Sequence, residues 1–276
     1  MEGMMKKITI KAHTPWTHID FAEIFDFRWV FIMLILRDIK LRYKQTFFGV
    51  AWVIIQPLLS ALLFTVIFGR MIKVSSDGLP YVVFAFCGLV PWLVFSQSLQ
   101  RASNSLINDS RLITKIYFPR IFIPLSATFG VAIDFVISLV IMGVLLTVHQ
   151  LPPSPNLLFL PIATVVLFAF SSGVNMLLAA FNVYYRDFKH IVPFLVQLWM
   201  YASPLVYSGS MVPEKYRLIY SLNPMAGIID IFRWALLGLP TFPMTSFCVA
   251  ALSSGVILVI GTFVFRKIEH YFADII

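Results

Sequence analysis

The residues whose type and spacing point most directly to chemistry are cations near the start of the chain. Arg37, Lys40 and Lys44 recur at a spacing that places three positive charges on one face of a helix. The apolar run before them, residues 29–36, is too short to cross a bilayer. The pattern therefore predicts an amphipathic helix over residues 20–46, lying along the inner membrane surface with its cations toward anionic lipid. Such a helix either anchors the following span or also contacts a cytoplasmic partner.

A second polar segment, residues 102–119, separates two long apolar stretches. A cap at Asn108, Asp109 or Ser110 predicts a short helix with one basic and one apolar face, and Pro119 ends it. Displayed between two spans, this helix has the form of a coupling element that docks on a partner, although an ordinary amphipathic linker fits the same pattern. The candidate docking residues are Arg111, Leu112, Lys115, Ile116 and Tyr117.

Residues 209–240 carry charges but remain unusually apolar. Asn223 followed by Pro224 is a helix start signal, and Gly238 with Pro240 is a stop signal. The helix between them is too short to cross a membrane, which predicts one arm of a re-entrant hairpin in the outer half of the bilayer. Its candidate gate residues are Tyr216, Asn223, Pro224, Asp230 and Arg233, although Asp230 and Arg233 are also spaced for a plain intrahelical ion pair.

Aromatic side chains make up 16% of the chain, and some lie near amides and hydroxyls on the same apolar stretches. Rings that stack on sugar faces without strong specific bonds would let a long glycan slide. Core packing and anchoring at the membrane interface are the alternative roles for any single ring. The candidate channel aromatics are Trp92, Phe95, Trp199, Tyr201 and Tyr207.

Motifs for covalent catalysis are absent from the sequence. It contains no G-x-x-x-x-G-K-[ST] phosphate loop, no H-E-x-x-H and no G-x-S-x-G. Asp134 is an acid in the middle of an apolar stretch, and we interpret it as an interhelical hydrogen-bonding residue rather than part of a proton relay. The prediction is that this chain is not an enzyme and holds no metal.

The helices that position these residues are predicted from the hydrophobic composition of the chain. Hydrophobic residues make up 59% of the 276 positions and charged residues 12%, with a mean hydropathy of +0.88. These values predict a single all-α membrane domain over residues 1–276. Its six predicted transmembrane helices span residues 47–71, 79–101, 120–148, 157–183, 190–208 and 244–266.

The distribution of Lys and Arg predicts the orientation of the chain. Most of them fall in segments that lie inside when the N-terminus is cytoplasmic, and an even number of spans then makes both termini cytoplasmic. The formal net charge of +8 reflects this topology rather than nucleic-acid binding. Lys6 and Lys7 precede no apolar core of a cleavable signal peptide. Cys87 and Cys248 lie in predicted spans, where we expect packing and no disulfide.

Four stretches together resemble a known family. They are RDIKLRYKQTFFGVAWVIIQPLL, LITKIYFPR, NVYYRDFKHIVPFLVQLWMYASPLVYS and LNPMAGIIDIFRWALLG. The chain resembles, over nearly its whole length, the permease subunits of ABC-2 type polysaccharide exporters, the O-antigen (Wzm) and teichoic-acid (TarG) group.

The resemblance implies a homodimer of six-span permeases in the cell inner membrane. Two copies of a separate ATP-binding (Wzt-like) subunit would supply ATP and Mg, so no cofactor is expected in this chain. The substrate would be an undecaprenyl-diphosphate-linked polysaccharide of O-antigen type, moved from the cytoplasmic to the outer face. The interface and coupling helices would contact the ATPase, and the re-entrant hairpin would form the outer gate. The implied contacts for the lipid diphosphate are Arg37, Lys40, Arg42, Lys44 and Arg120.

Other functions stay open on the sequence. Within transport, an ABC-2 exporter of teichoic acid, capsule, lipid or drug is the alternative. An integral membrane enzyme that processes glycans or lipids is the alternative of another class, and it is disfavoured because no catalytic pair of carboxylates, or of His with an acid, lies in or beside a span. An ion channel would need a ring of charges or a carbonyl-rich filter that the sequence does not show.

Overall fold

The regular secondary structure is helical throughout the part of the chain that the structure describes. This computed structural model describes residues 21–44, 51–185, 187–269 and Phe272. Several predicted features lie outside the described residues: the N-terminal lysines, the ends of the interface helix at 20 and 45–46, and the start of the first span at 47–50.

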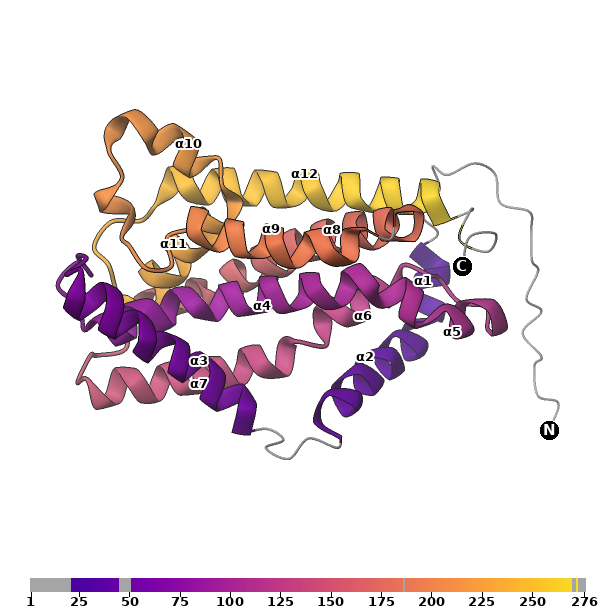
Figure 1. Ribbon diagram of the computed structural model, residues 1–276, viewed down its shortest axis with the longest axis horizontal. Helices are drawn as coiled ribbons and strands as arrows, with labels where there is room; N and C mark the ends of the chain where they lie inside the picture. Colours follow the sequence, from indigo (N-terminus) through magenta and orange to yellow (C-terminus); the bar gives the residue numbers. More distant parts are fainter. Residues whose placement is uncertain (1–20, 45–50, 186, 270–271, 273–276) are drawn as a thin grey trace.

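Five helical stretches among the described residues are long and apolar enough to cross a membrane. They run approximately along the long axis of the molecule (Figure 1). They are α3 (Ala51–Phe64) with its π-helical continuation (Thr65–Met71), α4 (Tyr81–Asn108), α6 (Phe122–Phe129) with α7 (Ala132–Val148), a 3₁₀ turn (Pro155–Phe159) with α8 (Leu160–Tyr184), and α12 (Met244–Glu269).

The predicted span over residues 190–208 corresponds to a shorter helix. Helix α9 (Phe188–Ala202) has 15 residues, and Ser203 is extended with φ −106° and ψ 148°. Pro204 explains this early end, because the residue before a proline is driven out of the helical region. Within the described residues, five helices therefore reach spanning length, and α9 is a shorter apolar helix beside them.

Two other boundaries differ from those predicted. Helix α4 continues to Asn108, beyond the predicted end of its span at residue 101, because Ala102 and Leu106 are buried and favour continued helical packing. The predicted span over 120–148 is interrupted between α6 and α7 at Gly130 and Val131. Glycine weakens a helix at such a point, since it loses the most backbone entropy on ordering.

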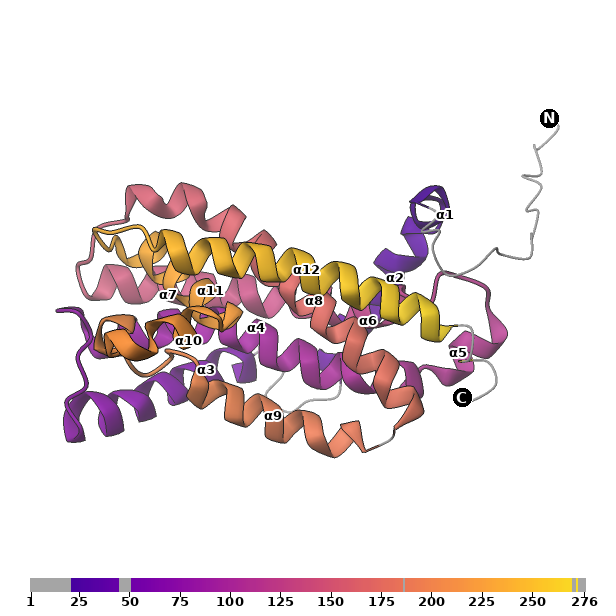
Figure 2. The ribbon, with the colours of Figure 1, turned by 90° about the horizontal axis from the view of Figure 1, so that it is seen from above.

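The shorter elements gather at opposite ends of the bundle (Figures 1 and 2). Helices α1 (Phe21–Asp26), α2 (Arg28–Tyr43) and α5 (Ser110–Lys115) lie at one end, with α2 oblique to the long helices. At the other end lie the 3₁₀ turns Gly209–Met211 and Glu214–Tyr216, α10 (Arg217–Ser221) and α11 (Pro224–Leu237). We call these the α2 end and the α11 end.

Helix α4 forms the centre of the bundle and α3 its periphery. In the most apolar window of each helix, 83% of α4 is buried but only 11% of α3. Helices α8 and α12 cross closely where two glycines meet: a Cβ added to Gly261 would lie 2.3 Å from the backbone oxygen of Gly173. Small residues allow such close backbone approach in membrane helices.

Candidate functional site

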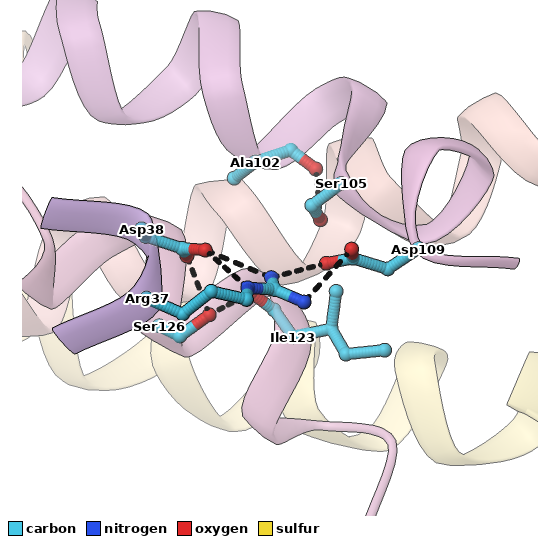
Figure 3. A network of polar contacts seen from close by, with 7 residues as sticks. All are labelled: Arg37, Asp38, Ala102, Ser105, Asp109, Ile123 and Ser126. Carbon is cyan, nitrogen blue, oxygen red and sulfur yellow. Dashed lines mark hydrogen bonds and ion pairs between the residues drawn. The ribbon is translucent and has the colours of Figure 1, made fainter. Parts of the chain in front are cut away.

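At the α2 end, Arg37 joins helix α2 to the start of the coupling segment. Its Nη1 and Nη2 donate to Oδ1 and Oδ2 of Asp109 at 3.0 and 2.6 Å, as a planar fork does with a carboxylate (Figure 3). Nη2 also donates to Asp38 Oδ1 at 2.8 Å, and Asp38 accepts from Ser126 Oγ on α6 at 2.9 Å. Burial lowers the pKa of Arg37, but the bonds to Asp109 and Asp38 outweigh it and the pKa is raised. This predicted diphosphate contact is therefore already neutralised.

Arg42 and Tyr43 join the end of α2 to Asp134 near the start of α7. The Arg42 guanidinium forms an ion pair with the Asp134 carboxylate, and the Tyr43 hydroxyl donates to the same carboxylate. Arg42 Nη2 also donates to Gln97 on α4 at 2.7 Å. Burial lowers the pKa of Arg42 to about 10, and repulsion from Arg101 acts in the same direction. Asp134 thus makes the interhelical contact interpreted from the sequence, and its partners are two residues of α2.

The remaining predicted diphosphate contacts lie in different surroundings. Lys40 and Lys44 are exposed, and neither has a side-chain bond or ion pair within the described residues. Arg120 donates from Nη1 to the backbone oxygen of Glu269, at the end of α12, at 2.8 Å. The five predicted cations therefore do not form one anion-binding cluster: three hold helices together and two remain on the surface.

The coupling segment presents an exposed basic and apolar surface. Arg111, Lys115 and Ile116 are exposed and Leu112 is half-buried, while Ile113 on the opposite face is buried. Asp109 occupies the N-cap position of α5 without a side-chain capping bond, because its carboxylate binds Arg37 instead.

Tyr117 follows α5 and links the coupling segment to α1. Its hydroxyl donates to Glu23 at 2.8 Å, although the Tyr117 side chain is exposed. The hydrogen bond to Glu23, followed by burial, raises the pKa of Tyr117 to about 12. The segment predicted for docking is therefore bonded to other helices at both of its ends. Asp109 binds Arg37 of α2, and Tyr117 binds Glu23 of α1.

The five candidate channel aromatics separate into buried and accessible rings. Trp92 and Phe95 are 3% and 0% exposed, and they pack in the core, where Phe95 lies 4.9 Å from the ring of Trp199. Trp199 donates from Nε1 to Asn223 Oδ1 at 2.9 Å. Tyr201 is 62% exposed. The prediction that Trp92 and Phe95 line a sugar pathway is therefore corrected, because both rings are buried in core contacts.

At the α11 end, the predicted start and stop signals of the helix are confirmed. Asn223 is the N-cap and its side chain accepts from the backbone N–H of Met225, with Pro224 at the first helical position. Gly238 ends the helix in the left-handed region with φ 70°. Asn223 also donates to the Ala202 carbonyl at 3.1 Å, so the cap residue binds the end of α9. The start of α11 and the end of α9 are held together by this side chain.

Asp230 and Arg233 do not pair with each other among the described ion pairs. Asp230 accepts from the Tyr220 hydroxyl at 3.1 and 3.0 Å. Arg233 is 2% exposed and donates to the backbone oxygens of Leu205 and Tyr207 at 2.9 and 3.2 Å. Its guanidinium also lies 3.7 Å from the centroid of the Phe84 ring. The sequence suggested that these two residues pair, either to lock a gate or within one helix. In the structure Asp230 instead binds α10 through Tyr220, and Arg233 binds the segment after α9.

Sequence reasoning missed the partners of these cations. Asp109 lies 72 residues from Arg37, and the carbonyls that bind Arg233 become available only where α9 ends. Tyr220 and Asp38 carry no motif of their own. In a sequence, an acid or cation near a helix end is only a weak signal of an interhelical bond, and it does not identify the partner residue.

These features first define a class. The described residues contain five apolar helices of spanning length, the buried α4 and four others, and these make the chain a multi-pass membrane protein. Comparison with known proteins then defines the family: residues 30–237 match the family described as ABC-2 type transporter. The chain belongs to the ABC-2 type transporter family, which confirms the resemblance seen in its sequence motifs.

Named relatives cover most of the chain. It is 30% identical to the O-antigen export system permease protein RfbA of Klebsiella pneumoniae, over 89% of this chain and 94% of that protein. It is also 30% identical to a protein of the same name from Myxococcus xanthus, over 76% and 81% of the two chains. The polysialic acid transport protein KpsM of Escherichia coli is 21% identical over 74% and 80%.

Proposed function

We propose that this chain is the membrane permease of an exporter of O-antigen-type polysaccharide, with a separate subunit that binds and hydrolyses ATP. The observation that carries the proposal is the likeness to relatives named as O-antigen export permeases, at about 30% identity over most of the chain. The more distant likeness to a polysialic acid transport protein agrees with polysaccharide as the cargo and makes capsule export the second candidate. The permease itself carries out no covalent chemistry.

In this proposal the chain crosses the inner membrane six times, and both termini are cytoplasmic. Helix α9 with the turn residues that follow it, up to Ser208, forms the fifth of these spans in chain order, and α12 forms the sixth. The exposed apolar side chains of α9, such as Phe194 and Leu198, support contact with lipid or with a second copy of the chain. The working unit is a homodimer bound to two ATP-binding subunits, and ATP and Mg are held by those subunits.

The α2 end is the proposed cytoplasmic end, where the ATPase docks. The exposed surface of Arg111, Lys115 and Ile116 supports this role, because it offers positive charge and apolar area together. Arg37 and Asp109 connect this surface directly to α2. A movement of α5 driven by the ATPase would therefore be passed on to α2, which we propose lies at the inner membrane surface.

The α11 end is the proposed outer end, with α10 and α11 as a re-entrant hairpin that closes the pathway. Its support is two sets of bonds from α11: Asn223 binds the last residue of α9, and Arg233 binds the segment that follows α9. An undecaprenyl-diphosphate-linked glycan would pass between two copies of the chain. Trp199, Tyr201 and Tyr207 are the rings that we retain as proposed sugar contacts. Of the three, Tyr201 is exposed and the other two are half-buried.

Co-purification with the ATPase encoded beside this chain tests the proposal. We expect a stable complex and surface display of polysaccharide in cells that contain both proteins. Reversal of Arg111 and Lys115 to Glu should abolish both. The matched control is Arg217→Glu, another exposed cation but at the α11 end, which should leave the complex intact. A chain that needs no ATPase partner, or that transfers glycosyl or acyl groups alone, would contradict the proposal.

A further inference from the structure

A cavity of about 660 Å³ opens between α3, α4 and α7, beside the end of α2. This volume lies within the range of roughly 300–1,000 Å³ that is usual for ligand pockets. One part of its wall is polar and another part is apolar. The polar part includes Arg42, Gln97, Gln100, Arg101 and Asp134.

The two cations in this cavity differ in what balances them. Arg42 already forms an ion pair with Asp134 and donates to Gln97. Arg101 lines the cavity from α4 and has neither a hydrogen bond nor an ion pair within the described part of the chain. Asp38 attracts Arg101 electrostatically, but its carboxylate accepts from Arg37 and Ser126. Arg101 is thus a half-buried cation whose donors remain available.

A guanidinium inside a membrane protein strongly favours an anionic partner, because removal of its hydration is costly unless hydrogen bonds replace it. Arg101 presents planar donors that match the oxygens of a phosphate group. Gln97 and Gln100 lie on the same helix and line the same cavity, so their side chains can add hydrogen bonds around one ligand.

The apolar wall indicates what kind of molecule carries the anion. The apolar part is lined by Trp52, Val53 and Pro57 of α3, Leu93 of α4 and Phe135 of α7. A free inorganic anion gains nothing from such walls, whereas a lipid chain next to a phosphate does. The cavity therefore combines one unpaired cation, several amide groups and an apolar surface, as an amphiphile requires.

We propose that this cavity binds the phosphate group of a membrane lipid, with Arg101 as the charged contact. The lipid is either an anionic phospholipid or the lipid diphosphate of the exported glycan, and the second case rests on the proposed function. In both cases the binding cation is Arg101 inside the cavity, rather than the exposed lysines of α2.

Lipid retention by the full chain, purified with its ATPase in detergent, tests this assignment. Undecaprenyl diphosphate, phosphatidylglycerol and zwitterionic phosphatidylcholine would be titrated separately, and native mass spectrometry would measure the bound lipid. We expect Arg101→Gln to weaken retention of one of the two anionic lipids about tenfold, because a charge-assisted hydrogen bond is lost. Arg101→Lys should retain part of the binding. Lys40→Gln is the matched control, since it removes an exposed cation outside the cavity.

Each outcome has a defined meaning. Selective weakening for undecaprenyl diphosphate identifies the substrate headgroup as the ligand, and selective weakening for phosphatidylglycerol identifies a resident phospholipid. Equal retention of both lipids by the wild type and Arg101→Gln overturns the proposal, as does an equal loss with Lys40→Gln. If Arg101→Gln does not fold, Gln100→Glu decides, because it places a competing carboxylate at an exposed position beside Arg101. Polysaccharide export by the wild type is read separately, so failure of the proposed function and failure of this site are distinguished.

Discussion

The two ends of the bundle bind their interior arginines in different ways. At the α2 end, Arg37 and Arg42 pair with two carboxylates, one from the junction of α4 with α5 and one from α7. At the α11 end, Arg233 donates to two backbone oxygens in the segment after α9 and lies over a Phe84 ring. Side-chain ion pairs can be exchanged or reversed by substitution, whereas backbone carbonyls cannot. The comparison indicates that α2 is held by side-chain ion pairs, which we call adjustable contacts, and that α11 is held by bonds to backbone oxygens, which we call fixed contacts.

The largest effect is expected from loss of the fixed contact. Arg233→Ala removes a buried side chain and leaves the oxygens of Leu205 and Tyr207 without a donor, which should lower the free energy of unfolding by about 4 kcal/mol. Thermal or denaturant unfolding in detergent measures this. Arg217→Ala, at a side chain that is 60% exposed, is the control and should change little. Equal stability of the two variants would remove the distinction between the two ends.

Asp134→Asn should have the next largest effect. It keeps an acceptor for the Tyr43 hydroxyl but leaves Arg42 without a carboxylate. We expect a loss of about 2 kcal/mol, because Gln97 still accepts from the guanidinium. Glu214→Gln removes a carboxylate at a side chain that is 90% exposed and serves as the control. An unchanged melting temperature of Asp134→Asn would mean that Arg42 does not depend on this pair.

The Arg37–Asp109 contact is expected to be weaker but reversible. Each single alanine substitution should destabilise the protein, and the double-mutant cycle should give a coupling of about 1 kcal/mol, since the two side chains are 33% and 22% exposed. The exchanged pair Arg37→Asp with Asp109→Arg should recover part of the stability and of the ATPase complex. If the exchanged pair loses as much stability as Arg37→Asp and Asp109→Arg lose when added together, the ion pair cannot be reversed at this position.

Tyr117→Phe should have the smallest effect, about 0.5 kcal/mol, because the bond to Glu23 lies at an exposed position. The contact should be easier to detect through the ionisation of Tyr117 at alkaline pH. The pKa of Tyr117 is raised in the folded protein to about 12, so its contribution is complete below the unfolded pKa near 10 and is lost as pH rises through 12. Ultraviolet difference titration against Tyr117→Phe should place this ionisation above the ordinary tyrosine value of about 10. An ordinary ionisation for Tyr117 would contradict the Glu23 bond.

Several features of the fold were predictable because their causes are local in the chain. Long apolar stretches require helices in lipid, and the sequence places most of them correctly. Asn223, Pro224 and Gly238 define the ends of α11 through contacts with residues only a few positions away. The exposure of Arg111 and Lys115 follows in the same way from the alternation of polar and apolar residues on a short helix.

By itself, then, the sequence determined that this is a helical membrane chain of the ABC-2 type, and it located most of the long apolar helices and both ends of α11. The tertiary structure alone decided which charges remain available. Arg37 and Arg42 are neutralised by acids 72 and 92 residues away, whereas Arg101 is left facing a cavity. It also decided that Phe95 is core rather than channel surface. The physical reason is that helix formation depends on neighbours in the chain, whereas charge pairing and burial depend on which helices pack together.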